Sequence, residues 1–314
     1  MRLLFVVHRY APYPGGSEYY VQNMAEEMLK RGHDVTVLAH EHKGDYNGVK
    51  VSDDYQEMLG NQGWHLIIVH GGDCISQNIV HINSNNIQSS ILYLIVKPSE
   101  SQVCLHGLAH ERFLGYSTSM DIDHLRKHNV LERGRRIRHG IVPHLYCRAN
   151  LSGKTIFVSA GGFYPHKAMG PLAEAFTKAK IPNAELHLYG YGEEHLMPAE
   201  NDVVKCFFGK DKMDVLFAIS SADAYIMNSY EEGFGLVLLE AMMHKTPWYA
   251  RDIAGAKDMC YYGTTYKDEK ELMELLRNHK RDEEKIDNAY NYVMTNHTIQ
   301  DTCNDIEDIL LEIM

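Results

Sequence analysis

Residues 228–248 read NSYEEGFGLVLLEAMMHKTPW and place two carboxylates, Glu232 and Glu240, in a segment that otherwise has the composition of a buried core. Burying a carboxylate is costly unless a positive or hydrogen-bonding group meets it. Gly233 and Gly235 let the backbone approach a ligand, and the helix predicted after them begins with unpaired amides. Such amides and the positive end of the helix dipole favour an anion such as a phosphate. The stretch therefore predicts a ligand site, where amides suit a phosphate and Glu240 suits a diol.

Apolar segments of strand composition alternate with helical segments on both sides of this stretch. A strand is predicted before it at 224–228 and another at its end, at 247–250. Short buried strands separated by helices are typical of a parallel, doubly wound sheet. The other predicted strands are 2–8, 35–39, 64–70, 91–96, 102–106, 155–160, 184–189 and 203–208, and the predicted helices are 18–31 with Ser17 as N-cap, 169–179, 213–220, 234–244 and 298–313.

The alternating pattern breaks at residues 140–153, a turn-rich stretch that starts no periodic element. We predict a linker there. It separates two α/β domains, 1–147 and 148–297, and the helix at 298–314 is expected to pack back toward the first domain. Two such domains facing each other would hold a ligand in the central cleft, at the carboxyl ends of the strands.

Composition limits the classes to which this protein can belong. Its 314 residues carry a formal net charge of −11, which argues against nonspecific nucleic-acid binding by the whole surface but not against a local basic patch. The six cysteines are widely spaced without a CxxC motif, which indicates buried thiols in a reducing compartment. The histidines lack metal-site spacing, so we expect no metal. No secretory leader or membrane-spanning run is visible, and we expect a cytoplasmic protein.

Several motifs follow one another in an order typical of one enzyme family. They are SAGGFYPHKAMGPLAEAF (159–176), PNAELHLYGYGEEH (182–195), SADAYIMNS (221–229), the E-x7-E spacing of Glu232 and Glu240, and TPWYARDIAGAKD (246–258). The first domain matches more loosely, through VVHRYAPYPGGSEYYVQNMAEEMLKRGHDVTVLA (6–39) and CLHG (104–107). The series resembles the retaining glycosyltransferases of family four, or glycosyl transferases group 1. The resemblance implies the GT-B fold, in which two Rossmann-like, doubly wound parallel-sheet domains face a central cleft.

The resemblance also implies an activity. It is the transfer of a glycosyl group from a nucleoside-diphosphate sugar to an acceptor hydroxyl, with retention at the anomeric carbon. Residues 1–147 would form the acceptor-side domain and residues 148–297 the nucleotide-sugar-binding domain. No cofactor is implied, because the nucleotide sugar is a co-substrate. No metal is required if Lys167, backbone amides and the helix dipole offset the charge of the leaving diphosphate.

The matching positions imply roles for individual residues. Glu240 would bind the nucleotide ribose and Glu232 would contact the donor sugar. Lys167 matches the lysine that meets the diphosphate, and His106 matches the histidine that faces the donor sugar near the reacting carbon. The catalytic set is therefore His106, Glu232 and Lys167, and the donor-binding set includes Glu240, Gly233, Phe234, Gly235, Gly15 and Gly16.

One position departs from the family pattern. Relatives usually have an arginine five residues before the lysine, and this chain has Gly162 there. The diphosphate then lacks its expected bidentate partner. Arg251, just after the 247–250 strand, is our candidate for the missing cation and completes the donor-binding set.

A cluster of basic residues bears on the acceptor. Between His124 and Arg148 seven Lys and Arg residues stand against the single acid Glu132, which gives 7 − 1 = +6. A cluster this dense predicts an anionic acceptor. A phosphate-bearing lipid at a membrane surface is one form, with peripheral binding of a cytoplasmic enzyme, and modified DNA is the other. The predicted acceptor patch comprises Arg126, Lys127, Arg133, Arg135, Arg136 and Arg138.

Two alternative functions stay open. One is a DNA-modifying glycosyltransferase of the phage hydroxymethyl-pyrimidine type, which the short first domain would suit. The other is a GT-B protein that is no transferase, either a nucleotide-sugar epimerase or a binding module, and the missing arginine at Gly162 keeps it open. The glycines at 190–192 imitate only part of a dinucleotide fingerprint, so an NAD enzyme is not favoured. No obligate protein partner is visible.

Overall fold

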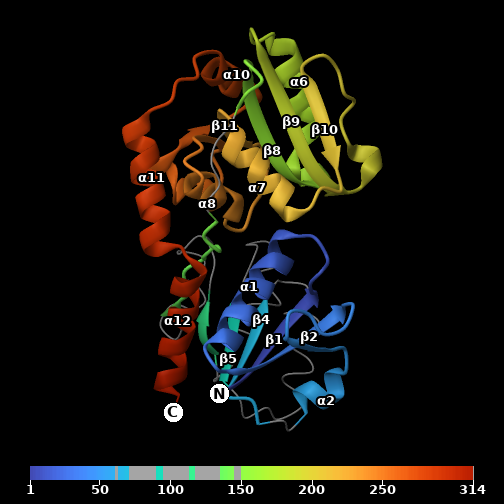
Figure 1. Ribbon diagram of the computed structural model, residues 1–314, viewed down its shortest axis with the longest axis vertical. Helices are drawn as coiled ribbons and strands as arrows, with labels where there is room; N and C mark the ends of the chain where they lie inside the picture. Colours follow the sequence, from blue (N-terminus) through green and yellow to red (C-terminus); the bar gives the residue numbers. More distant parts are fainter. Residues whose placement is uncertain (61–62, 71–89, 95–112, 117–134, 145–149, 314) are drawn as a thin grey trace. The chain divides into compact units, whose positions relative to one another are not determined.

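The computed structural model describes residues 1–60, 63–70, 90–94, 113–116, 135–144 and 150–313. The chain divides into two compact units (Figure 1). Unit 1 comprises Met1–Val142 together with His297–Met314, and unit 2 comprises Pro143–Asn296. The division after Val142 falls inside the turn-rich stretch of the sequence. The predicted strand at 102–106 lies outside the described residues.

Unit 1 is built on a parallel sheet with the strand order β3-β2-β1-β4-β5-β6-β7. The strands predicted at 2–8, 35–39 and 64–70 are confirmed, and the one predicted at 91–96 lies within the sheet as β5. Three short strands, β3, β6 and β7, were not predicted, because two to four residues give no readable periodicity. The strands are β1 (Arg2–Arg9), β2 (Asp34–Glu41), β3 (Lys50–Ser52), β4 (Leu66–His70), β5 (Ser90–Leu94), β6 (Phe113–Tyr116) and β7 (Arg135–Arg136).

Within the described residues, unit 1 has two long helices. Helix α1 (Gly16–Lys30) buries Tyr20, Val21, Met24, Ala25 and Met28, at the spacing that the sequence predicts. Its N-cap is Gly15, so the prediction of Ser17 was wrong: the backbone enters the helix earlier, and no side chain caps it. A short helix, α2 (Tyr55–Leu59), precedes β4.

The C-terminal helix α12 (Ile299–Glu312) packs against α1. It begins with a capping box between Thr298 and Asp301, which satisfies two otherwise unpaired amides. The guanidinium of Arg31 donates to Glu307 at 2.5 Å and to Asn304 at 2.8 Å, which fixes α12 beside the end of α1.

Unit 2 has a parallel sheet with the order β10-β9-β8-β11-β12-β13. The predicted strands and the helices at 169–179, 213–220 and 234–244 are confirmed to within a few residues, and only the short β13 was missed. Its elements are β8 (Thr155–Phe163), α6 (Met169–Ala179), β9 (Ala184–Gly192), β10 (Val204–Phe208), α7 (Lys212–Ser221), β11 (Ala224–Met227), α8 (Leu236–Met243), β12 (Trp248–Arg251), α9 (Ala254–Lys257), β13 (Thr264–Tyr266), α10 (Glu269–Arg277) and α11 (Glu283–Asn296).

Both sheets share one topology, in which the chain starts in the middle, runs to one edge and then crosses to the other side. This doubly wound order reverses between β1 and β4 in unit 1 and between β8 and β11 in unit 2. Loops that leave in opposite directions at such a reversal open a crevice at the carboxyl ends of the strands. Among the described residues, no helix is both long and apolar enough to span a bilayer.

Candidate active site

The reversal in unit 2 brings two predicted catalytic residues together. Lys167 follows β8, Glu232 follows β11, and the ammonium of Lys167 donates to the carboxylate of Glu232. Ser229 also donates to Glu232, at 2.7 Å. Both members of the ion pair stay partly accessible, with side-chain exposures of 22% and 17%. The pair is therefore held in place while remaining open to a ligand.

Strands β8 and β11 are paired at only two positions, Ala224 with Phe157 and Tyr225 with Val158, and then diverge. The hydroxyl of Tyr225 then donates to the carbonyl of Ala160 at 2.9 Å and accepts from its amide at 3.2 Å. Burial raises the pKa of this phenol, so it stays protonated. Tyr225 thus satisfies the backbone of β8 where the crevice begins.

The loop that carries Lys167 is short and tightly turned. Pro165–Lys167 form one 3-10 turn, and Ala168 then adopts a left-handed conformation with φ of 51° before α6 starts. The carbonyl of His166 accepts from the amide of Tyr230 at 2.8 Å. This bond ties the loop after β8 to the loop after β11, so the two halves of the site are positioned together.

A second lysine–glutamate pair lies at the same end of the sheet, where the carboxyl ends of its strands meet. Glu240, on α8, accepts from the ammonium of Lys212 at 2.5 Å, and Lys212 is the first residue of α7. Glu240 is 7% exposed, and its Oε2 has no hydrogen-bond partner. A buried carboxylate oxygen without a donor is costly, and it is the group that a ligand hydroxyl would satisfy.

Two histidines surround Glu240. His244 contacts the carbonyl of Glu240 through Nδ1 at 2.7 Å, and the amide of His144 contacts the Met243 sulfur at 3.3 Å. Burial lowers the pKa of both imidazoles, more than the Glu240 carboxylate raises it. Both are therefore neutral near pH 7, and Lys212 is the positive partner that the structure gives Glu240.

The backbone between the two glutamates is shaped by close packing. Gly235 has φ of 86° and caps α8, a conformation that L side chains rarely adopt. Gly255, on α9, approaches so closely that a Cβ there would lie 1.9 Å from the carbonyl oxygen of Phe234. The loop 233–235 is thus pressed between α8 and α9, and its shape depends on glycine at both places.

Arg251, predicted as the missing cation, makes a different set of contacts. Its guanidinium binds Glu269, donates to Asn228 Oδ1 at 3.1 Å and donates to the carbonyl of Lys267 at 3.1 Å. It also lies over the ring of Tyr230 at 4.8 Å. Arg251 therefore fixes Asn228 and Tyr230 at the end of β11.

Gly162 stands where the resemblance implies an arginine, and an aromatic ring occupies the adjacent space. A Cβ at Gly162 would lie 2.3 Å from the ring of Tyr164, and one at Gly192 would lie 2.7 Å from the same ring. The ring also stacks with His166 at 6.0 Å between centroids. An arginine side chain at position 162 would need the space that the Tyr164 ring occupies, so the two side chains cannot both fit in this arrangement.

The glycine loop of unit 1 lies at the other reversal point, after β1. A Cβ at Gly15 would lie 1.9 Å from Glu18 Oε2, whereas one at Gly16 would meet nothing within 4 Å. Arg9 contacts Glu18 at 3.0 Å, and burial still raises the pKa of this carboxyl. A side chain at Gly15 would require the Glu18 carboxylate to move, while Gly16 presents open backbone.

Several predicted residues cannot be compared with the geometry, because His106, Arg126, Lys127 and Arg133 lie outside the described residues and only the backbone of Arg135 and Arg136, in β7, is described. Arg138 is described. It donates to Asp305 at 2.6 Å and lies 3.7 Å from Asp301, both on α12. Its charge is therefore offset inside unit 1.

Lys212 was missed by the sequence reasoning. A signal exists, however, because a lysine at the start of a helix opposes the helix dipole and needs an acidic partner. Asp211 provides the N-cap by accepting from the amide of Asp214, so α7 begins at Lys212 rather than at Met213 as predicted. Among the described residues, no His, Cys, Asp or Glu side chains gather in a group that could hold a metal ion.

Comparison with known proteins identifies the domain that carries this site. The sequence model of glycosyl transferases group 1 matches residues 148–292. This segment is similar to the glycosyl transferases of group 1. The match confirms the family predicted from the ordered motifs. A search of curated proteins gives no match.

Solved structures of the same fold extend over both units. Sucrose-phosphate synthase from Thermosynechococcus elongatus superposes with a TM-score of 0.78 at 16% identity, covering 99% of this chain and 98% of that one. Anabaena HepE in complex with UDP-glucose gives 0.77 at 15%, covering 99% and 100%. WaaG, a glycosyltransferase of lipopolysaccharide biosynthesis, gives 0.71 at 18%, covering 98% and 99%. These structures confirm the GT-B fold, and together with the family match of residues 148–292 they confirm the prediction of a glycosyltransferase.

Proposed function

We propose that this glycosyltransferase takes its sugar from a nucleoside-diphosphate sugar and transfers it with retention of the anomeric configuration. The observation that carries the proposal is the buried Oε2 of Glu240, which has no hydrogen-bond partner. It lies at the carboxyl end of the sheet, where the Lys167–Glu232 pair also lies. A ribose diol supplies the hydrogen that this oxygen lacks. The fold neighbour HepE has been solved with UDP and with UDP-glucose, which agrees with such a donor.

In this proposal the two ion pairs have different tasks. Lys212 holds Glu240 in a fixed orientation, so that the carboxylate can accept hydrogen bonds from ribose. Lys167 exchanges its contact with Glu232 for one with the diphosphate, which frees Glu232 to meet the donor sugar. As the bond from the anomeric carbon to the diphosphate breaks, its electron pair passes to the phosphate oxygens. Lys167 and the amides at the start of α8 then stabilise that charge.

Retention follows if the acceptor hydroxyl attacks from the face that the diphosphate leaves. The leaving phosphate oxygen can then take the hydroxyl proton, so no separate enzymatic base is required. His106 is proposed to face the reacting carbon from unit 1, together with Gly15 and Gly16. Arg251 has a structural role in this proposal and holds Asn228 and Tyr230 in place, because its contacts with Glu269 and Asn228 are made inside unit 2.

For the acceptor we propose an anionic molecule, bound by the basic cluster of unit 1. Arg138 is withdrawn from this cluster, because Asp305 and Asp301 offset its charge. A phosphate-bearing lipid at a membrane surface and modified DNA remain the two forms, and the enzyme would be cytoplasmic with peripheral binding in the first case. The proposed acceptor residues are Arg126, Lys127, Arg133, Arg135 and Arg136.

The donor is tested by incubating the enzyme with a panel of nucleotide sugars and measuring release of nucleoside diphosphate with and without acceptors. We expect release that depends on one donor and increases with acceptor. Release of no nucleoside diphosphate from any donor, combined with interconversion of the sugar, would favour the epimerase alternative. Mass spectrometry of the acceptors glycosylated from the preferred donor then identifies the product.

The acceptor is tested by charge reversal at Arg133, Arg135 and Arg136. We expect weaker sedimentation with anionic vesicles if the acceptor is a lipid, or weaker retardation of duplex DNA with a log–log salt slope lower by about 0.9 per lost phosphate contact. Reversal at the exposed Lys178, Lys180 and Lys210 of unit 2 is the matched control. Unchanged binding and turnover in the first triple variant would leave a neutral acceptor.

A further inference from the structure

Asn228 directly follows β11 and is 1% exposed. Its side-chain amide donates to the carbonyl of Ala168 at 2.9 Å. Ala168 is the residue after Lys167, in the loop that follows β8. This hydrogen bond, the Asn228 link, therefore joins the loop that leads to Glu232 to the loop that carries Lys167.

A second hydrogen bond joins the same two loops, from the amide of Tyr230 to the carbonyl of His166 at 2.8 Å. The order is antiparallel, because Asn228 meets Ala168 and Tyr230 meets His166. Lys167 therefore lies between two points of attachment, one residue to either side. A lysine side chain is long and flexible, so the place of its ammonium depends on the backbone that carries it.

Neighbouring groups fix the orientation of the Asn228 amide. Its Oδ1 accepts from the phenol of Tyr266 at 2.7 Å and from the guanidinium of Arg251 at 3.1 Å. Burial raises the pKa of Tyr266, so the phenol stays protonated. Since both partners of the oxygen are donors, the nitrogen must face Ala168. A second contact of this nitrogen, with the carboxylate of Glu269 at 3.4 Å, completes the hydrogen bonding of the amide.

The partners of Asn228 come from separate elements of unit 2. Tyr266 lies on β13, Arg251 on β12 and Glu269 on α10. A buried amide that is fully hydrogen-bonded is rigid, whereas a partly satisfied one is costly. Asn228 thus holds the turn with Lys167 at a fixed place relative to three other elements. At 1% exposure it is too buried to contact a donor, so its influence on the reaction passes through Lys167.

We propose that Asn228 is a positioning residue for glycosyl transfer, which holds the backbone of Lys167 where its ammonium can meet both Glu232 and the donor diphosphate. This role rests on the proposed function, because it needs a donor bound at this ion pair. Misplacement by 1 Å can cost about 10²-fold in rate. Loss of the Asn228 link should therefore lower kcat, while the donor KM changes little because Glu240 still binds the ribose.

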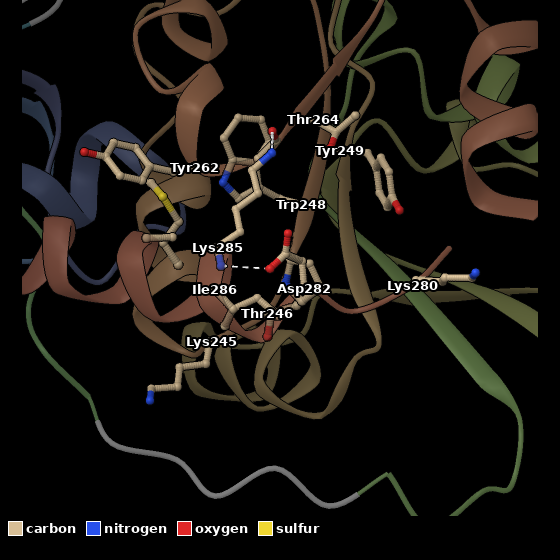
Figure 2. Close-up of a pocket in the computed structure, with 14 residues that line it drawn as sticks. Lys245, Thr246, Trp248, Tyr249, Tyr262, Thr264, Lys280, Asp282, Lys285 and Ile286 are labelled. Carbon is tan, nitrogen blue, oxygen red and sulfur yellow. Dashed lines mark hydrogen bonds between the residues drawn. The ribbon is translucent and has the colours of Figure 1, made fainter. Parts of the chain in front are cut away.

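Asn228→Ala removes the link without adding charge. We expect kcat to fall at least about tenfold, with the donor KM changed by less than about threefold. Thr246→Val is the matched control, because it also removes one buried hydrogen bond, from the Thr246 hydroxyl to the carbonyl of Ile219 at 2.8 Å. Thr246 lines a cavity before β12 (Figure 2), at the opposite end of the sheet from Asn228. The control should leave kcat unchanged.

A double-mutant cycle with Lys167→Ala separates positioning from a general loss of structure. If Asn228 acts through Lys167, Asn228→Ala should lower kcat by no more than about twofold in the Lys167→Ala background. Tyr266→Phe keeps the ring and removes one donor to Asn228, so it should lower kcat by a smaller factor. It carries the kinetic test if Asn228→Ala does not fold. Equal losses in the two backgrounds would overturn the proposal.

Hydrogen exchange tests the Asn228 link without any substrate. The backbone amides of Lys167 and Ala168, which donate to the carbonyls of Tyr164 and Pro165, should exchange faster in Asn228→Ala than in the wild type. In Thr246→Val their exchange should be unchanged.

The outcomes distinguish this role from the proposed function. A wild-type enzyme that releases no nucleoside diphosphate from any donor would contradict the proposed function, and with it this role of Asn228. An active wild type with an unchanged kcat in Asn228→Ala, or with unchanged exchange at Lys167 and Ala168, would overturn the role of Asn228 alone.

Discussion

The reversal points of the two sheets share one topology and differ in chemistry. In unit 2 the strands that flank the reversal are followed by Lys167 and Glu232, an accessible ion pair. In unit 1 the strand β4 ends in His70, which is 4% exposed, and its ring packs against Tyr20 with centroids 5.5 Å apart. The topology therefore creates a crevice at the same place twice. The side chains decide that the carboxylate at the reversal point of unit 2 is accessible, whereas in the described part of unit 1 the carboxylate of the Arg9–Glu18 pair is only 9% exposed and lies in the same unit as the buried His70.

The largest effect is expected when the cation at the reversal point of unit 2, Lys167, is removed. Lys167→Ala should lower turnover by at least about 10²-fold, the usual cost of losing one donor that stabilises transition-state charge. Steady-state kinetics with the preferred donor measure it. Lys154→Ala is the matched control, because Lys154 pairs with Glu185 at 2.5 Å at the other end of β8 and should change turnover little. Near-normal turnover of Lys167→Ala would show that another cation meets the diphosphate.

The second ion pair should affect binding more than turnover. Glu240→Ala should weaken donor affinity by roughly 1.5–3 kcal/mol, because buried ribose hydroxyls lose a charged acceptor. Calorimetry with the donor measures the loss, and Lys210→Ala, an exposed lysine two residues from Lys212, is the control. Unchanged affinity in a folded Glu240→Ala protein would contradict the ribose assignment.

Packing around the donor loop provides a third comparison. Gly255→Ala should destabilise unit 2 by about 1–3 kcal/mol and raise the KM for the donor, because its Cβ would overlap the carbonyl of Phe234. Gly170→Ala meets nothing within 4 Å and should be neutral or slightly stabilising. Denaturant unfolding of both variants separates the two effects. Equal stability of the two would mean that α9 moves without cost.

The smallest effect concerns pH and unit 1. Burial lowers the pKa of His70 to about 4. The unfolded chain takes up this proton at the ordinary pKa of 6.5, so stability is complete above that pH and falls as the pH decreases toward 4. Between pH 7 and 5.5 we expect a loss of about 1 kcal/mol from this group.

Trp64 reports on unit 1 when Trp248 is replaced by Phe, so its emission can follow the denaturant unfolding of that unit at each pH. A His70→Phe variant should flatten the pH dependence. The same change at the exposed His65 should not. An unaltered pH profile in His70→Phe would mean that other groups dominate the acid sensitivity of unit 1.

The sequence by itself determined the alternation of strands and helices, the doubly wound class and the placement of two glutamates at the carboxyl end of the sheet. It could do so because buried strands and amphipathic helices have readable periods. The E-x7-E spacing needs only the loop and helix that contain it. The segments that it missed, such as β3, β6, β7 and β13, are four residues or fewer and owe their structure to neighbouring strands.

Only the tertiary structure decided which charges meet. Lys212 reaches Glu240 across 28 positions of sequence, and Arg251 binds Glu269 and Asn228 instead of remaining available beside the phosphate loop. Arg138 forms an ion pair with Asp305 on α12, although in the sequence it lies inside a basic cluster. Charge density along a chain is local, whereas ion pairing depends on which elements pack together. The physical role of a lysine or arginine is therefore set by the fold.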